Sequence, residues 1–478
     1  MTDHKITRRS LAPLAAGAAI AATASCSPDV PTLPQSRQFP ADFKWGVATA
    51  AAQTEGLPDA DGRGPSIWDV FAKEPGKIID KSDASQGTDS YRRYKDDVAL
   101  IAGANLKAYR FSIAWPRVMP NGAGAVNEQG LDYYKRLTDA LHEAGIEPFA
   151  TLYHWDLPQA LQEKGGWANR DTAHRLADYA SVIAGKLGDR IANFIILNEA
   201  AVHTIEGHVL GTGAPGTSSG NALGPVTHHQ NLGQGLSIKA IRASRPSAKV
   251  GTTMALMPVR AEGPWWHLSN RLPAYEFDLV WNKAYLDPLF KGSYPTAFES
   301  FVKTAVKDGD MAAMKQPVDF LGVNYYSPAY IKYDGTNPGS IGPGLPPAGV
   351  ELDAFGREID PSGIGENLAR LRNEYGNPAV IITESGCSDK LSNGPAVIAD
   401  PFRVDYLRRH LEVVKAEMEQ GSPVKGFFVW SIIDNWEWNS GYTAKFGMVA
   451  MDRASGVRTP KTSYEWFAQL AKSGLLKA

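Results

Sequence analysis

The stretch Phe194-Ile195-Ile196-Leu197-Asn198-Glu199 decides the fold, because a short apolar run ends there in an amide and a carboxylate. Four consecutive apolar residues are typical of a strand that is buried on both faces, as in a parallel sheet covered by helices. The stretch Val380-Ile381-Ile382-Thr383-Glu384 repeats the pattern much later in the chain. Both stretches therefore predict parallel strands that each carry a glutamate to the edge of a sheet.

Similar apolar runs recur along the chain and alternate with segments of helical periodicity. Apolar residues return every three or four positions within residues 131–144, 176–187 and 407–418, and a glycine follows each segment. Eight strands interleaved with helices favour a single (β/α)8 TIM barrel over an open doubly wound sheet. We interpret the Gly/Pro-rich residues 334–350 as a long surface loop. The expected strands end at Ala48, Ser112, Tyr153, Leu197, Met254, Asn324, Thr383 and Trp430.

The composition indicates one large globular domain with an uncharged partner. Of the 478 residues 43% are apolar, and 49 Lys+Arg nearly balance 51 Asp+Glu to give a net charge of −2. A nucleic-acid-binding protein usually has a basic excess and a disordered chain has fewer apolar residues, so neither class is expected. The 12 tryptophans leave two interpretations open, a groove lined with flat side chains or ordinary core packing.

The first 25 residues have the pattern of an export signal. The twin arginines Arg8 and Arg9 precede a small apolar run from Leu11 to Ala24. This run is shorter than the roughly 20 residues that a helix needs to span a bilayer. We expect residues 1–25 to be a twin-arginine-type signal that sends the protein to the periplasm or the medium. The alternative is a frayed amphipathic terminus.

Residues 26–38 are expected to form a proline-containing tether before one domain at residues 39–478. Cys26 follows the expected cleavage point and leaves two alternatives open, a lipid anchor in the membrane or a free mature terminus. Thr23 stands where lipoprotein signals usually have an aliphatic residue. The only other cysteine is Cys387, so no disulfide within the chain is expected.

The residues at the expected strand ends indicate the chemistry, because the carboxyl ends of the strands carry the active site in a (β/α)8 barrel. Amides and carboxylates pair with sugar hydroxyl groups, and the C–H face of a pyranose packs on tryptophan. These ends therefore predict a site for a neutral sugar. They hold no lysine and comprise Gln53, Glu55, Arg110, His154, Trp155, Asp156, Asn198, Glu199, Asn324, Tyr325, Tyr326, Glu384 and residues 430–438.

Glu199 and Glu384 are the candidate catalytic pair, delivered by the fourth and seventh expected strands. Two carboxyl groups about 5 Å apart make a retaining glycosidase, in which one attacks the anomeric carbon and the other protonates the leaving oxygen. The acid needs a raised pKa, which burial and a neighbouring carboxylate provide, while Arg110 would keep its partner ionised. The alternative is that each glutamate caps a helix that begins after its strand.

The chain resembles the family 1 glycoside hydrolases, typically β-glucosidases, from Phe39 to about Phe467. The matching blocks follow the order of the family. They are Phe39-Pro40, Trp45-Gly46-Val47-Ala48-Thr49, Gln53, Glu55-Gly56, Arg63-Gly64-Pro65-Ser66-Ile67-Trp68-Asp69, Tyr109-Arg110-Phe111-Ser112-Ile113-Ala114-Trp115-Pro116-Arg117, Thr151-Leu152-Tyr153-His154-Trp155-Asp156-Leu157-Pro158, Leu197-Asn198-Glu199, Gly322-Val323-Asn324-Tyr325-Tyr326, Ile382-Thr383-Glu384 and Trp430-Ser431-Ile432-Ile433-Asp434-Asn435-Trp436-Glu437-Trp438.

The resemblance implies that Glu199 is the acid/base and Glu384 the nucleophile. It implies that Asn198 binds the sugar 2-hydroxyl, that Tyr326 donates to the nucleophile, and that neither a cofactor nor a metal ion is needed. The implied sugar pocket consists of Gln53, His154, Trp430, Glu437, Trp438 and Phe446, with Gln53 and Glu437 sharing the 4-hydroxyl and with Arg110 and Asn324 in support. Without the resemblance, His154 and the tryptophans would be interpreted as core residues.

Four features of the sequence bear on the substrate. Ala200 replaces the proline that usually follows the acid/base, and Ser385 replaces an asparagine after the nucleophile; neither change removes a catalytic group. Members that hydrolyse 6-phosphoglycosides have small residues in place of Glu437-Trp438, and plant-type thioglucosidases have glutamine in place of Glu199. Neither pattern is present, and these residues do not separate glucose from its 4-epimer.

Other function classes have weaker support. The string Gly216-Thr217-Ser218-Ser219-Gly220 matches an esterase elbow but lacks the strand before it and the helix after it. Gly122 and Gly124 are too few for a dinucleotide site, and the adjacent His228 and His229 point to different helix faces.

We therefore expect an exported, retaining, exo-acting β-glucosidase for small neutral β-glycosides or oligosaccharides, with no nucleic-acid partner. Within the family the alternatives are a β-galactosidase, a β-fucosidase or a transglycosylating enzyme. Outside enzymes the alternative is a sugar-binding protein on the same barrel.

Overall fold

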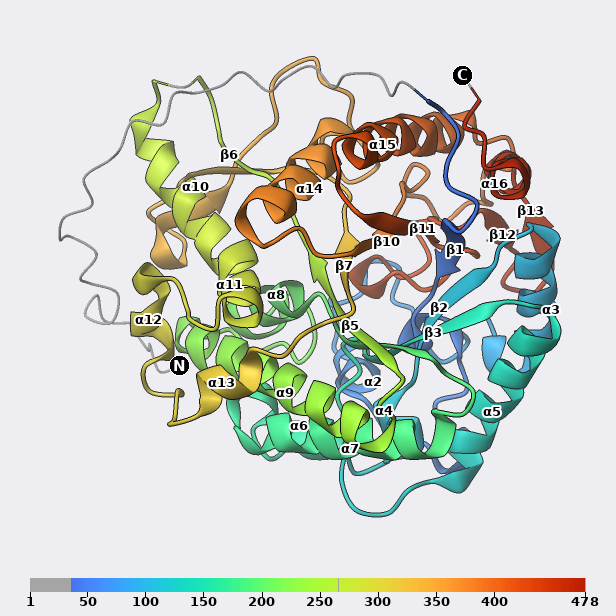
Figure 1. Ribbon diagram of the computed structural model, residues 1–478, viewed down its shortest axis with the longest axis horizontal. Helices are drawn as coiled ribbons and strands as arrows, with labels where there is room; N and C mark the ends of the chain where they lie inside the picture. The colour runs from blue at the N-terminus through green and yellow to red at the C-terminus, as the bar shows by residue number, and fades with distance from the viewer. Residues whose placement is uncertain (1–35, 265, 478) are drawn as a thin grey trace.

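A closed parallel barrel lies at the centre of the molecule (Figure 1). The computed structural model describes residues 36–264 and 266–477, and eight strands of this part of the chain form the barrel. The predicted (β/α)8 fold is confirmed, and each strand ends within two residues of its expected position. Around the barrel the order is β1 (Lys44–Ala48), β11 (Val424–Trp430), β10 (Val380–Ser385), β7 (Phe320–Asn324), β5 (Lys249–Ala255), β4 (Asn193–Asn198), β3 (Glu147–Tyr153) and β2 (Ala108–Ser112).

Helices cover the outside of the barrel (Figure 1). The three predicted helical segments correspond to α5 (Glu128–Glu143), α7 (Asp171–Leu187) and α15 (Pro401–Glu419). Their apolar residues repeat every three or four positions because one face of each helix is buried, as Leu131, Leu137 and Leu141 are in α5. Other helices of the described residues are α3 (Ser90–Gly103), α9 (Leu223–Ser244), α11 (Ala284–Phe290), α14 (Ser362–Glu374) and α16 (Thr462–Ser473).

The barrel interior changes from apolar to polar along the strands. Ala108, Phe149 and Phe428 belong to one buried apolar cluster inside the barrel, and the Phe149 and Phe428 rings meet edge to face at 5.2 Å. Side chains two residues further along a strand point to the same face. Arg110 and Trp430 therefore enter the interior above this apolar floor, on the side where the strands end.

The Gly/Pro-rich segment expected as a surface loop contains a short strand. β9 (Ile341–Pro343) pairs antiparallel with β8 (Ala329–Tyr333), which pairs in turn with β6 (Val259–Ala261). Within the segment expected to be a long surface loop, residues 341–343 therefore form a strand of this small sheet. The sequence signal was weak because only Ile341 in this strand has a high strand propensity.

The expected export signal at residues 1–25, Cys26 and most of the expected tether lie outside the described residues. The described end of the tether lies against the C-terminal part of the domain. Arg37 forms an ion pair of 3.0 Å with Glu412 of α15, and Gln38 forms an antiparallel bridge with Leu475. Among the described residues no helix is both long and apolar enough to cross a membrane.

Candidate active site

Two buried glutamates lie at the carboxyl ends of two barrel strands, β10 and β4, which are separated in the barrel by β7 and β5. Glu384 lies inside β10 and is 4% exposed, and Glu199 directly follows β4 and is 7% exposed. Glu199 occupies the residue before α8 (Ala200–Val202) with a left-handed φ of 49°, but its side chain makes no capping hydrogen bond. The next α-helix after Glu384 begins only at Pro401. The alternative interpretation of both glutamates as helix caps is therefore wrong.

Glu384 is held by a cation and a phenol. Arg110 contacts Oε1 of Glu384 through Nη1 in a fully buried ion pair, and the Tyr326 hydroxyl donates to Oε2 at 2.8 Å. The second terminal nitrogen of Arg110 donates to Asn198 Oδ1 at 2.6 Å. A buried carboxylate needs such partners to remain charged, so this arrangement suits an ionised Glu384.

Glu199 has a neutral donor instead. Asn324 Nδ2 donates to Glu199 Oε1 at 2.8 Å and lies 3.1 Å from Asn198 Oδ1. Burial, and then the negative charge of Glu384, raise the pKa of Glu199 to about 8. Burial and the neighbouring charge therefore favour the protonated form of Glu199 at neutral pH, and the two glutamates have different surroundings although they share one site.

A third carboxyl group, that of Glu437, lies on the β11 side of the barrel mouth. Gln53, on the short helix α1 (Ala51–Thr54), donates to Glu437 Oε2 at 3.2 Å, and the indole nitrogen of Trp430 lies 3.4 Å from the same oxygen. Burial raises the pKa of Glu437 to about 8. The structure thus brings Gln53 to Trp430 and Glu437, although Gln53 is far from both of them in the sequence.

His154 connects this group to the strand that precedes Glu199. Asn198 Nδ2 lies 2.9 Å from His154 Nε2, and burial lowers the pKa of His154 well below its usual range, so the ring is neutral. Because the amide nitrogen is a donor, Nε2 accepts and Nδ1 carries the proton. Within the described residues, His154 Nδ1 and Gln53 Oε1 are buried and have no hydrogen-bond partner. Buried polar atoms of this kind indicate where a polar ligand binds.

Aromatic rings line the same region. Trp438 packs against Trp155 at 4.9 Å and against Trp68 at 4.6 Å, and its ring is nearly parallel to His154 at 6.0 Å. Phe446 contacts Tyr326 edge to face at 6.0 Å. These flat surfaces beside carboxyl and amide groups suit a sugar, whose ring has an apolar face and a polar edge.

Two aromatic residues of this region were given no role in the sequence analysis. Trp68 lies in a matching block of sequence, and its spacing alone does not reveal the contact with Trp438. Phe355 stacks on Phe446 at 5.9 Å and is 38% exposed. It lies in a loop closed by a bridge between Leu352 and Glu358, and nothing in its sequence neighbourhood signals a site.

Several residues from the expected strand ends lie apart from this site. Glu55 forms a buried ion pair of 2.8 Å with Arg117 and accepts from Tyr134 at 2.6 Å, so its role is structural. The Tyr325 hydroxyl donates to the carbonyl oxygen of Asp360 at 2.6 Å. Arg110, by contrast, belongs to the site through its contact with Glu384, although it lies in the middle of β2 rather than at its end. The role of each of these residues is therefore decided by the partner that its side chain contacts and not by its position near the end of a strand.

The two departures from the family pattern leave both glutamates in place. Ala200 begins α8, and the Ser385 hydroxyl lies 3.3 Å from the hydroxyl of Tyr406. Gly386 follows, and a Cβ atom there would lie 2.1 Å from the carbonyl oxygen of Trp430. Glycine is therefore required where the chain leaves β10 and passes β11.

The rival motifs do not form sites in the described part of the chain. The Gly216–Gly220 string follows a π-helix, His203–Leu210, and lies in irregular structure, which excludes an esterase elbow. In α9 His228 pairs with Asp310 at 2.9 Å, and His229 lies 2.9 Å from the carbonyl oxygen of Trp167. Across the described residues no group of three or more His, Cys, Asp or Glu side chains is arranged to hold a metal ion.

Comparisons with known proteins agree with the geometry. The family model described as "Glycosyl hydrolase family 1" matches residues 35–475. The chain is 38% identical to Beta-glucosidase A of Thermotoga maritima over 92% of this chain and 99% of that protein. It is 39% identical to the Bifunctional beta-D-glucosidase/beta-D-fucosidase of Bifidobacterium breve over 90% and 97%. A solved structure of the Thermotoga maritima β-glucosidase in complex with deoxynojirimycin superposes with a TM-score of 0.86 at 37% identity, covering 92% of this chain and all of that chain (100%).

Proposed function

The chain belongs to glycosyl hydrolase family 1, and from this premise we propose that it is a retaining, exo-acting β-glycosidase that removes terminal β-D-glucosyl residues from the non-reducing end. The observation that carries the proposal is the contrast between two buried glutamates. Glu384 is paired with Arg110, whereas the pKa of Glu199 is raised to about 8. One ionised and one protonated carboxyl group are what a double displacement needs at neutral pH.

In the first step Glu384 attacks the anomeric carbon and the bond from that carbon to the leaving oxygen breaks. Glu199 gives its proton to the leaving oxygen, so the aglycone departs as a neutral alcohol. The hydrogen bond from Tyr326 and the ion pair with Arg110 orient the attacking carboxylate. The product of this step is a glycosyl ester on Glu384.

In the second step the roles of the two groups reverse. The ester carries no charge, so the repulsion that helped to raise the pKa of Glu199 disappears when it forms. Glu199, now ionised, takes a proton from water, and the water oxygen attacks the anomeric carbon. The bond to Glu384 breaks and its carboxylate is restored. Two inversions return the original β configuration.

The sugar ring binds through the groups around Glu437. Glu437 and Gln53 share the 4-hydroxyl, Asn198 binds the 2-hydroxyl, and His154 Nδ1 donates to a neighbouring hydroxyl. Trp430, Trp438 and Phe446 line the apolar faces of the pocket. Gln53 Oε1 and His154 Nδ1 support this assignment, since both are buried and lack a partner among the described residues. The relatives named β-glucosidase support glucose as the sugar.

The test is hydrolysis of 4-nitrophenyl β-D-glucoside followed by proton NMR, which identifies the anomer formed first. We expect β-glucose as the first product, and α-glucose would contradict the retaining mechanism. Galactoside, fucoside and disaccharide substrates in the same assay define the sugar and detect transfer to an acceptor sugar. A β-fucoside is the second candidate, because one relative is named for both activities. Sugar binding without turnover would favour a binding protein instead.

We further propose that the twin-arginine segment exports the enzyme to the periplasm or the medium, where Cys26 leaves a lipid anchor and a free mature terminus as the two alternatives. Arg8, Arg9 and the apolar run that follows support export. Replacing both arginines with lysine should retain the full-length protein inside the cell. Labelling with a radioactive fatty acid, compared between the natural chain and Cys26→Ser, separates an anchored protein from a free one.

A further inference from the structure

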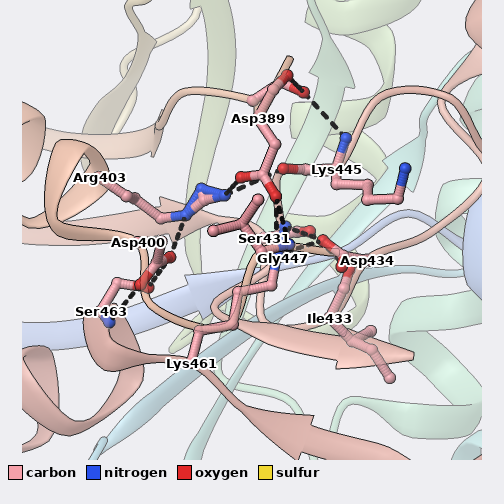
Figure 2. Close-up of polar contacts among 12 residues, drawn as sticks. Asp389, Asp400, Arg403, Ser431, Ile433, Asp434, Lys445, Gly447, Lys461 and Ser463 are labelled. Atoms are coloured by element: carbon pink, nitrogen blue, oxygen red, sulfur yellow. Dashed lines mark hydrogen bonds and ion pairs between the residues drawn. The ribbon is translucent and has the colours of Figure 1, made fainter. Parts of the chain in front are cut away.

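A chain of buried charges lies between α15, α16 and the loops that follow β10 and β11 (Figure 2). Arg403 Nη2 lies 2.6 Å from Asp389 Oδ1, Lys461 Nζ lies 4.0 Å from Asp389 Oδ2, and Lys461 Nζ lies 3.0 Å from Asp434 Oδ1. The side chains of Arg403 and Lys461 are fully buried, at 0% exposure. Cations and carboxylates therefore alternate along one line.

The Asp434 end of this chain closes the loop that carries the sugar-binding residues. Asp434 Oδ1 accepts from the backbone N–H of Gly447 at 2.8 Å as well as from Lys461. Gly447 follows Phe446, and Asp434 precedes Glu437 by three residues. A single carboxylate oxygen thus joins the two arms of the loop on either side of Glu437.

The Arg403 end joins this loop to the one that follows Glu384. Arg403 donates to the carbonyl oxygen of Cys387 at 2.8 Å and to that of Lys445 at 3.0 Å. The N–H of Asp389 also donates to the carbonyl oxygen of Lys445 at 3.2 Å. The network therefore fixes the strand that bears Glu384 and the loop that bears Glu437 to the same pair of helices.

Stability alone is a weak explanation for such an arrangement. Replacing a buried ion pair by well-packed apolar residues is often neutral or stabilising, whereas charges and their hydrogen bonds specify one geometry. Asp434 Oδ2 is buried and has no partner among the described residues, and burial raises the pKa of Asp434 against the effect of Lys461 and Arg403. The network is thus costly to bury, and what it specifies is the position of the loop.

We propose that Lys461 and Asp434 are positioning residues that act on the sugar through Glu437. This inference rests on the proposed function, which gives Glu437 the role of sugar binding. Misplacing a binding group by about 1 Å is enough to lower the rate of a reaction about 100-fold. Loss of the Lys461–Asp434 pair should therefore lower kcat/KM when the Glu437 carboxyl group is present. It should have little further effect when that group has been removed.

A double-mutant cycle tests this coupling. Asp434→Asn and Lys461→Met are made in the natural chain and in a Glu437→Gln background, and kcat/KM is measured with 4-nitrophenyl β-D-glucoside. We expect each change to lower kcat/KM at least about tenfold in the natural chain and less than about threefold with Glu437→Gln, since residues that act as a unit are not additive. Equal losses in the two backgrounds, or no loss at all, would overturn the proposal.

The matched control is Asp310→Asn, because Asp310 is also a buried, ion-paired aspartate. It pairs with Arg170 at 2.5 Å and with His228 at 2.9 Å, and α13 (Asp310–Met314) lies across the barrel from α16 (Figure 1). Its effect on kcat/KM should be the same with and without Glu437→Gln. If a single variant fails to fold, the double variant Asp434→Asn/Lys461→Met replaces it in the cycle. The double variant removes both charges of the pair, so neither charge is left without its partner.

The dissociation constant of deoxynojirimycin, measured by calorimetry in the same variants, reports the coupling without turnover. In the natural chain, Asp434→Asn and Lys461→Met should each weaken the binding of deoxynojirimycin. In the Glu437→Gln background, the same changes should weaken it only slightly further. A natural chain that hydrolyses no β-glycoside would contradict the proposed function but not this inference, which the calorimetric cycle then decides. Additive losses of binding would contradict the inference alone.

Discussion

Glu199 and Glu384 carry the same chemical group but have different hydrogen-bond donors. Glu384 lies against the guanidinium of Arg110 and accepts from Tyr326 at 2.8 Å, whereas Glu199 accepts from the neutral amide of Asn324 at 2.8 Å. The pKa of Glu199 is raised to about 8, first by burial and then by the charge of Glu384. The surroundings of the two side chains therefore divide the roles of nucleophile and acid/base.

Glu384→Gln should abolish hydrolysis of aryl β-glucosides, because an amide at this position cannot form the glycosyl ester. We expect kcat to fall at least about 10⁴-fold, as expected when a covalent step is lost. Circular dichroism should show that the variant is folded, since glutamine preserves the volume and can still accept from Arg110. Activity near that of the natural chain would show that another group is the nucleophile.

Glu199→Ala should separate the two steps. Glycosylation by substrates with good leaving groups, such as 2,4-dinitrophenyl β-glucoside, needs little help from an acid, but the second step loses its base. We expect a burst of dinitrophenol followed by slow turnover. Added azide should restore turnover and yield β-glucosyl azide, because a small anionic nucleophile needs no base. If azide has no effect, Glu199 is not the acid/base.

The alkaline limb of the pH–rate profile should report Glu199. The protonated acid is the active form, so kcat/KM for alkyl β-glucosides should be retained below pH 8 and fall as the pH rises through about 8. For 2,4-dinitrophenyl β-glucoside the same limb should be much weaker. A limb of equal size for both substrates would assign it to a group other than the acid.

Much of the barrel could be predicted from the sequence because local rules govern it. Apolar runs placed the strand ends, and the two-residue period of a strand places Arg110 above Ala108 on the interior face. The partners of Glu384 could also be predicted, because the sequence analysis named both Arg110 and Tyr326, and both contact Glu384.

Features that depend on packing between distant segments were not predicted. Lys461 and Asp434 meet only because the start of α16 lies against the loop after β11, and neither residue has a local signal. The stacking of Phe355 on Phe446 depends on the path of a loop. Glu55 looked like a site residue by position, but the structure pairs it with Arg117. The fold followed from periodicity, whereas these partners follow from tertiary contacts.

A 6-phosphorylated β-glucoside should be a poor substrate. Gln53 is fully buried, the carboxyl group of the half-buried Glu437 lies beside it, and the nearby Arg357 is already paired with Asp353 at 2.6 Å. Placing a phosphate dianion there without a free cation costs several kcal/mol, so we expect kcat/KM to be at least about 100-fold lower than for the unphosphorylated glucoside. Comparable rates for 4-nitrophenyl β-glucoside and its 6-phosphate would refute this view of the pocket.

Glu437→Gln should stabilise the protein in a pH-dependent manner. Burial raises the pKa of Glu437 to about 8 from its usual value near 4.5. A carboxyl group with a raised folded-state pKa contributes stability that is fully present below its unfolded pKa and is lost as the pH rises to the folded value. Glutamine does not titrate, so the variant does not lose this stability. The free energy of unfolding of the variant minus that of the natural chain should therefore increase between pH 5 and pH 8. We expect a gain of about 1 kcal/mol or more, since each pKa unit corresponds to about 1.4 kcal/mol. Urea unfolding at both pH values measures it, and a difference that does not change with pH would contradict the raised pKa.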